Sequence, residues 1–166
     1  HFAIDPTGIA CLDIGSSTGG FTQLLLERGA SHVTAVDVGH AQMQPSLAAD
    51  VRVNLHEGVN ARDLDRSIIA SPPQLIVCDV SFISLRLALP KALDLAGAGA
   101  VLIALVKPQF EVGKGVNPHD EAEQARVCDE ISRFILESGW AVTGLVPSPL
   151  KGGDGTQEYL IAAHKL

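Results

Sequence analysis

A glycine-rich turn near the start of the chain constrains the fold more than any other segment. From Cys11 to Thr22 the sequence reads CLDIGSSTGGFT: an apolar strand that ends in an acid, a turn with Gly15, Gly19 and Gly20, and the start of an amphipathic helix. Glycine lets the backbone turn tightly and approach a ligand closely. A strand that leads into such a turn and then into a helix is typical of a nucleotide-type cofactor site at the carboxyl end of a parallel sheet.

The residue types in the turn distinguish between three classes of cofactor. A phosphate-binding P-loop requires a lysine where this chain has Phe21, and a dinucleotide fingerprint requires a glycine where it has Ser17. The remaining pattern, acid-x-Gly-x-x-x-Gly-Gly, favours S-adenosylmethionine, which carries no phosphate. We predict that Asp13 helps to hold the ammonium group of that cofactor, directly or through water, and that the backbone of the turn lines its methionine part.

An acid also follows the second predicted strand, and a polar residue follows the third. Asp37 stands where an acid accepts hydrogen bonds from ribose hydroxyls, although it could simply cap the strand end. Asn60 could read the adenine edge or form a turn, and spacing alone does not decide between these roles. The residues that we expect to bind the cofactor are Asp13, Gly15, Ser17, Thr18, Gly19, Phe21, Asp37, Val38, Asn60 and Asp79.

The rest of the chain alternates predicted strands and helices. Hydrophobic residues make up 46% of the 166 residues and aromatic residues only 4%, which suits an aliphatic core around a parallel sheet. We therefore predict one α/β domain over residues 1–166: a Rossmann-like class I methyltransferase fold with a mostly parallel seven-stranded sheet, an antiparallel last strand, and helices on both faces. The predicted strands cover residues 9–14, 31–36, 51–55, 75–78, 100–106, 141–146 and 158–163, and the later predicted helices cover residues 81–96, with a kink at Pro90, and 121–138.

Composition also narrows the setting in which the protein works. The longest apolar run, residues 95–106, is shorter than the roughly 20 residues that a membrane span needs, and no secretory signal is visible. The histidines show no metal-ligand spacing, and neither do the cysteines, which we interpret as buried free thiols in a reducing cytoplasm. The formal net charge of −7 argues against a domain that grips nucleic acid by charge alone.

Three charged residues stand where later strands begin or end. Asp79 and Lys107 follow predicted parallel strands, and Glu158 opens the last strand, so all three should meet at one rim beside the cofactor. Lys107 could accept the proton of a ribose hydroxyl if it is neutral, or stabilise the developing alkoxide if it is charged. Two nearby carboxylates would favour the charged form of Lys107 and raise its pKa, whereas burial would lower that pKa. The alternative is an ion-pair triad that only seals the sheet edge.

The chain resembles the TlyA family, a group of ribosomal-RNA ribose 2′-O-methyltransferases that are related to the FtsJ group and often labelled hemolysins. The resemblance covers nearly the whole chain. It implies S-adenosylmethionine as cofactor, ribosomal RNA or ribosomal subunits as partner, and a Lys-Asp-Lys-Glu tetrad whose last three members match Asp79, Lys107 and Glu158. The segments that carry it are DIGSSTGGFT (residues 13–22), CDVSFIS (78–84), LVKPQFE (105–111) and QEY (157–159).

Two departures from the family suggest a longer protein. No lysine precedes Lys91, so the first member of the tetrad is missing, and so is the small amino-terminal RNA-binding domain of the family. We expect this chain to be the catalytic domain, weak or inactive alone. Arg86, Lys114 and Lys151 are the best candidates for RNA phosphate contacts, although the pattern favours a solvated surface charge for each.

Other functions compete with RNA methylation. A small-molecule O-methyltransferase would need a closed pocket, and the chain has no insertion long enough to build one. A hemolysin or pore-forming protein would need membrane-active segments, which we do not find. A non-catalytic module that binds the cofactor is the third alternative. The target nucleotide, the ribosomal subunit and the oligomeric state cannot be read from the sequence.

Overall fold

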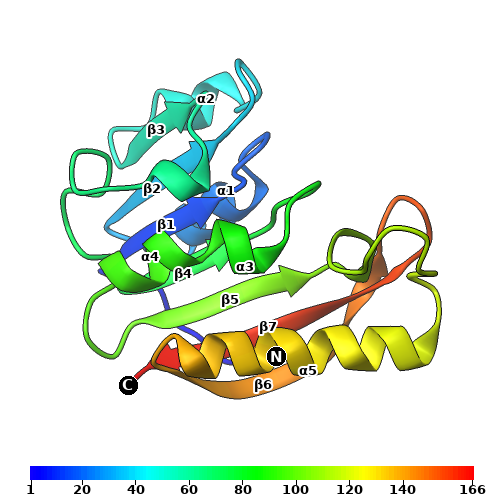
Figure 1. Ribbon diagram of the computed structural model, residues 1–166. Coiled ribbons are helices and arrows are strands. Elements are labelled where there is room, and N and C mark those ends of the chain that lie inside the picture. The colour runs from blue at the N-terminus through cyan, green and yellow to red at the C-terminus, as the bar shows by residue number, and fades with distance from the viewer.

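Seven strands form one mixed sheet in the computed structural model, which describes residues 1–166 (Figure 1). The order across the sheet is β3-β2-β1-β4-β5-β7-β6; the first five strands of the chain run parallel, and β7 is antiparallel to both of its neighbours. The predicted sheet, mostly parallel with an antiparallel last strand, is therefore confirmed. The strands are β1 (Ala10–Ile14), β2 (His32–Asp37), β3 (Val53–Glu57), β4 (Leu75–Cys78), β5 (Val101–Val106), β6 (Trp140–Lys151) and β7 (Gln157–Lys165).

Helices cover both faces of the sheet, as Figure 1 shows, with α1 on one face and α3, α4 and α5 on the other. Local signals fix where they begin: prolines open α2 and α4, and the Asp120 carboxylate caps α5 by accepting hydrogen bonds from the backbone N–H groups of Ala122 and Glu123. The helices are α1 (Gly20–Glu27), α2 (Pro45–Ala48), α3 (Leu85–Ala88), α4 (Pro90–Leu95) and α5 (Glu121–Glu137), and short 3₁₀ turns span Ala61–Asp63 and Pro108–Phe110.

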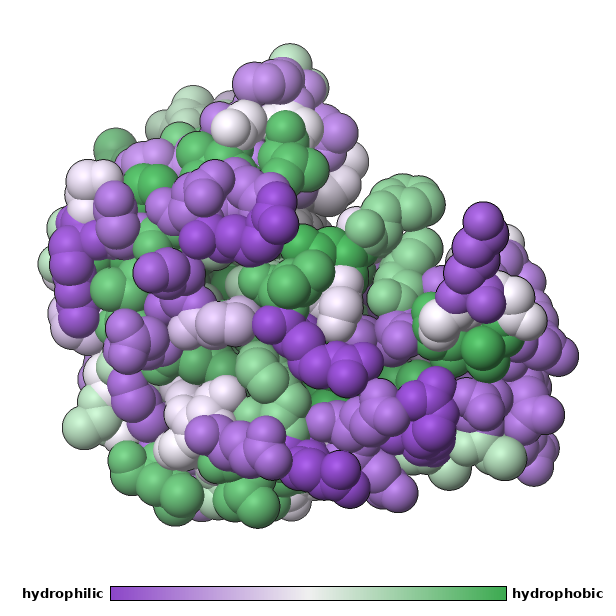
Figure 2. All heavy atoms as spheres, in the orientation of Figure 1, coloured by the Kyte–Doolittle hydropathy of each residue, from purple (hydrophilic) through white to green (hydrophobic).

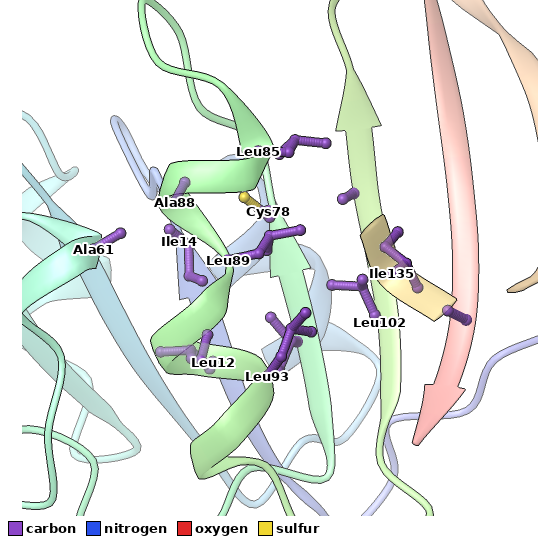
Figure 3. Packing of buried hydrophobic residues seen from close by; sticks show 14 of the residues in the cluster. Leu12, Ile14, Ala61, Cys78, Leu85, Ala88, Leu89, Leu93, Leu102 and Ile135 are labelled. Carbon is purple, nitrogen blue, oxygen red and sulfur yellow. The ribbon is translucent and has the colours of Figure 1, made fainter. Parts of the chain in front are cut away.

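Alternation along the strands divides the core between the two faces. A cluster of 24 buried residues lies under α3, α4 and α5, where Leu12 and Ile14 of β1 meet Leu89 and Leu93 (Figure 3). A smaller cluster of 7 buried residues, including Cys11, lies under α1. Because successive side chains of a strand point to opposite faces, this places Asp13 on the α1 face, among apolar neighbours. All three cysteines are free and buried, as predicted, and no helix is both long and apolar enough to span a bilayer.

Several predicted boundaries differ from the observed ones. The helix expected over residues 81–96 is two helices, because Ser84 caps α3 and Pro90 starts α4; residues 81–84 form a loop instead. Strand β3 begins two residues later than predicted, after an exposed turn. Strand β6 runs on to Lys151 instead of ending at Val146; it tolerates Pro147 and Pro149 because it is an edge strand and its register with β7 shifts there.

The turns after β1 and β4 touch at Gly15. Its φ of +79° is in the left-handed region, and a Cβ atom added there would lie 2.1 Å from the carbonyl oxygen of Asp79. A side chain would therefore force the two turns apart. Gly20 differs, because it is the first residue of α1, has no positive φ, and has open space where a Cβ would lie. Of these two glycines, only Gly15 is required by the backbone.

We predict that Gly15→Ala lowers the free energy of unfolding by roughly 2–5 kcal/mol, because it adds a steric clash to a disfavoured φ. Gly20→Ala, the matched control, should change stability by less than about 1 kcal/mol and in the stabilising direction. Urea unfolding followed by circular dichroism measures both. Equal effects of the two substitutions would contradict the close approach at Gly15.

Candidate active site

A cavity of about 870 Å³ opens at the carboxyl ends of β1, β2 and β4. The molecule is hollowed at this edge in Figure 2, with apolar surface inside the hollow. Of the residues expected to bind a cofactor, six line the cavity: Gly15, Ser17, Asp37, Val38, Asn60 and Asp79. Four others do not line it: Asp13 is buried, Phe21 packs against the smaller core cluster, and Thr18 and Gly19 continue the turn toward α1.

Asp13 lies buried below the glycine-rich turn. One carboxylate oxygen, Oδ2, accepts a hydrogen bond of 2.7 Å from Oγ1 of Thr22, whereas Oδ1 is buried without a partner. Burial raises the pKa of Asp13 to about 6; the charges of Asp79 and Asp37 act in the same direction and the hydrogen bond from Thr22 opposes them. A buried acceptor without a donor is costly, so a donor supplied by a ligand or a water would be favoured here.

Asp37 ties the glycine-rich turn to the end of β2. Its Oδ2 accepts a hydrogen bond of 2.8 Å from the backbone N–H of Ser17, and its Oδ1 accepts one of 2.7 Å from Gly39. A carboxylate offers about four acceptor sites, so both oxygens can still accept a hydroxyl. Asn60 has the turn-forming role that the sequence left open. Its side-chain oxygen accepts a hydrogen bond of 3.0 Å from the backbone N–H of Arg62, and the residue also lines the cavity.

Lys107 and Asp79 form an ion pair beside the cavity. The Lys107 Nζ lies 2.7 Å from Oδ1 of Asp79 and donates a hydrogen bond of 3.1 Å to Oγ of Ser81. The lysine side chain is only 12% exposed, against 38% for the aspartate. The structure thus brings together the two residues predicted at the ends of these parallel strands. It adds Ser81 as a partner of the lysine, which we did not predict although Ser81 lies in the quoted motif.

Glu158 reaches the same rim without joining that ion pair. Strands β5 and β7 pair Val106 with Tyr159, so one further step along the antiparallel register sets Lys107 opposite Glu158. Glu158 is only 7% exposed, and its carboxylate accepts a hydrogen bond of 2.9 Å from Nε2 of Gln109. It makes no ion pair with Lys107, so the predicted triad of charges is a lysine–aspartate pair with a separate glutamate nearby.

Glu111 is a structural member of the site that the sequence analysis did not single out. Its side chain is 2% exposed and accepts hydrogen bonds from Oγ of Ser84 at 2.5 Å and from the backbone N–H of Leu85 at 2.8 Å. Burial raises its pKa. Glu111 therefore fixes the loop after β5 to the start of α3. Arg86 lies 3.8 Å from Glu111 and 3.3 Å from Glu130, so two carboxylates already engage this candidate for RNA contacts.

Phe82 is an exposed aromatic side chain at the mouth of the cavity. It is 90% exposed, lies in the loop between Asp79 and α3, and has a φ of +64°. Its ring centroid is 4.9 Å from that of Phe110. An exposed aromatic ring in an unusual backbone conformation presents an apolar face to whatever approaches the rim. The signal in the sequence was an aromatic residue close behind a site acid, in a chain with few aromatics.

Comparison with known proteins identifies the family to which the chain belongs. A family model described as FtsJ-like methyltransferase matches residues 1–165. The chain is 47% identical over 165 residues to the 16S/23S rRNA (cytidine-2′-O)-methyltransferase TlyA of Mycobacterium tuberculosis, covering 96% of this chain and 62% of that protein. A solved structure of a Streptococcus thermophilus protein named as a hemolysin superposes with a TM-score of 0.95 at 37% identity, covering 99% of this chain and 62% of that one.

More distant structures share the fold. An S-adenosylmethionine-dependent methyltransferase from Listeria monocytogenes superposes with a TM-score of 0.74 at 14% identity and covers 98% of this chain and 93% of its own. The sheet is therefore that of the class I S-adenosylmethionine methyltransferases, as predicted. The chain spans about three fifths of the length of the TlyA protein that it matches.

The raised pKa of Asp13 predicts a stability that depends on pH. Below the ordinary pKa of 3.8 the carboxyl is protonated in both states and costs nothing; above about 6 it is ionised in both, and the folded state bears the full penalty. Asp13→Asn cannot ionise. The stability advantage of the variant over the natural protein should therefore grow by roughly 2–3 kcal/mol between pH 4 and pH 7. Chemical unfolding at both pH values tests this, and a difference that does not change with pH would contradict it.

Proposed function

Because the chain belongs to the FtsJ-like methyltransferase family, and within it to the TlyA group, we propose that it methylates the 2′-hydroxyl of a cytidine in ribosomal RNA with S-adenosylmethionine. The observation that carries the proposal is the Lys107–Asp79 ion pair at the rim of the cavity. We also propose that residues 1–166 form the methyltransferase domain of a protein with a further RNA-binding domain. The greater length of the relatives and the net charge of −7 support this.

The residues around the cavity suit this cofactor. Asp37 has acceptor sites left for the ribose hydroxyls, and Val38 offers an apolar surface to the adenine because it is 68% exposed. Asp13 has an unpaired buried oxygen for the ammonium group, reached through water because the residue does not line the cavity. The remaining contacts would come from residues that line the cavity: Gly15, Ser17, Asn60 and Asp79. Thr18, Gly19 and Phe21 do not line it and would act only through the shape of the turn.

The rim residues supply what a ribose hydroxyl lacks. When bound, S-adenosylmethionine provides an electrophilic methyl group on a positively charged sulfur. The 2′-oxygen would form a bond to that methyl carbon, and the electrons of the broken carbon–sulfur bond would return to sulfur. Lys107 would first release a proton of its ammonium group to solvent and would then accept the hydroxyl proton at Nζ, while Asp79 and Ser81 hold that nitrogen in place. Glu158 adds a second acceptor at the same rim.

The experiment that tests the proposal measures transfer of labelled methyl groups to 16S and 23S ribosomal RNA and to isolated subunits. We expect the intact protein to label a cytidine ribose, identified by mass spectrometry of the digested RNA. Lys107→Met should lower the rate by roughly 10²–10⁴-fold, the usual range for loss of a general base, without weakening binding of S-adenosylmethionine by more than about twofold.

Lys91→Met provides the matched control, because it removes one exposed positive charge on α4 and lies outside the cavity lining. Its rate should equal that of the natural protein. Unchanged labelling in Lys107→Met would remove the lysine from the mechanism. Absence of labelling with every RNA, although the cofactor binds, would overturn the proposed substrate.

We further predict that Phe82 stacks on a base next to the reacting ribose, because its exposed ring stands at the mouth of the cavity. Base–aromatic stacking contributes roughly 1–3 kcal/mol per base, so Phe82→Ala should weaken binding of the RNA by roughly 5- to 150-fold. Binding of S-adenosylmethionine should not change. Fluorescence anisotropy with labelled RNA and calorimetry with the cofactor separate the two effects, and an equal loss of both would contradict the stacking role.

A further inference from the structure

Gln109 connects the 3₁₀ turn that follows Lys107 to the start of strand β7. Its Nε2 donates a hydrogen bond of 2.9 Å to Oε1 of Glu158, and its own Oε1 is buried without a partner. The β6–β7 hairpin closes over this bond: a Cβ atom at Gly152 would lie 2.7 Å from the Gln109 nitrogen and 2.8 Å from the Glu158 oxygen. The backbone of the hairpin at Gly152 therefore encloses the hydrogen bond between Gln109 and Glu158. This bond holds the Glu158 carboxylate in one position.

The position matters because of what lies opposite Glu158. The pairing of β5 with β7 ends at Val106 and Tyr159, and one more step of the same register would set Lys107 across from Glu158, where opposite charges attract. Lys107 nevertheless contacts only Asp79 and Ser81. A second carboxylate in contact with the lysine would favour the ammonium form further, and an ammonium group has no lone pair for a proton.

We propose that Gln109 is a positioning residue that holds the Glu158 carboxylate off Lys107, so that the lysine keeps one carboxylate partner instead of two. This inference rests on the proposed function, in which Lys107 must be able to release its proton. Lys107 pairs with Asp79 at the end of β4, and both charges act on the neighbouring Cys78 together with those of Asp13 and Glu111, while Glu158 belongs to β7. Of these carboxylates, only Glu158 is restrained by Gln109.

The first test needs no turnover. The pH midpoint of the Lys107 side-chain titration is followed by NMR in the intact protein, in Gln109→Met, and in Gln109→Met combined with Glu158→Gln. Methionine keeps the length of the side chain but cannot donate, so Glu158 is freed to contact Lys107. We expect the midpoint to rise by about one pH unit in the single variant, at the low end of what one opposite charge produces, and to return in the double variant.

Gln23→Met is the matched control. Gln23 donates its amide to Glu27 at 2.8 Å on the exposed face of α1, so the substitution removes a similar bond outside the site. It should leave the Lys107 midpoint unchanged. A midpoint that stays fixed in Gln109→Met, in protein whose thermal unfolding shows it folded, would overturn the proposal. So would a rise that persists in the double variant, because it would not come from Glu158.

Kinetics supply the second readout. Gln109→Met should lower kcat at neutral pH by about tenfold, leave KM for RNA and for S-adenosylmethionine within about twofold, and regain activity as the pH rises. A purely structural role would instead change KM or stability without moving the pH profile. If the NMR midpoint moves as expected but no form methylates RNA, the positioning role stands and the proposed function fails, so the two conclusions are separable.

Discussion

The ion pair between Lys107 and Asp79 joins the carboxyl ends of two neighbouring parallel strands, and the surrounding loops are arranged to keep it in place. Gly15 lets the turn after β1 lie directly against the backbone of Asp79. Glu111, in the loop after Lys107, accepts hydrogen bonds at the start of α3. The loop that begins at Asp79 ends at this same point, so Glu111 ties the two loops together. A lysine that is mostly buried would be costly without its carboxylate, so the geometry of the rim and the stability of the fold depend on the same contact.

Carboxylates at this rim differ in role because they differ in their neighbours. Asp37 accepts two backbone hydrogen bonds and organises the turn. Asp13 accepts a hydrogen bond from Thr22 through one oxygen, its other oxygen has no partner, and burial raises its pKa. Such an arrangement destabilises the free protein and favours a bound donor, which is a common cost of a preorganised site. Residues of one chemical type therefore differ in how many of their acceptor sites the protein itself satisfies.

Sequence reasoning recovered the sheet and the rim because both follow from strong local patterns. Glycine spacing, aliphatic strands and polar residues at strand ends predicted Asp37, Asp79 and Lys107 in their observed places. Contacts between residues distant in the chain could not be predicted in this way. The bond from Gln109 to Glu158 depends on how a hairpin folds over the sheet, and that of Glu111 depends on where α3 begins. The prediction of one continuous helix over residues 81–96 was wrong because the Ser84 hydroxyl caps α3, so this helix begins only at Leu85.

The placement of β7 has a consequence for how the molecule is made. This strand lies in the interior of the sheet, between β5 and β6, although it follows β5 by about fifty residues along the chain. While the polypeptide emerges from the ribosome, β5 has one open edge and Glu158 has not yet been synthesised. Pairing of such distant strands is slow because a long loop must close first. The half of the sheet that carries the cavity can form early, whereas the rim where methyl transfer would take place is completed only after β7 has been synthesised.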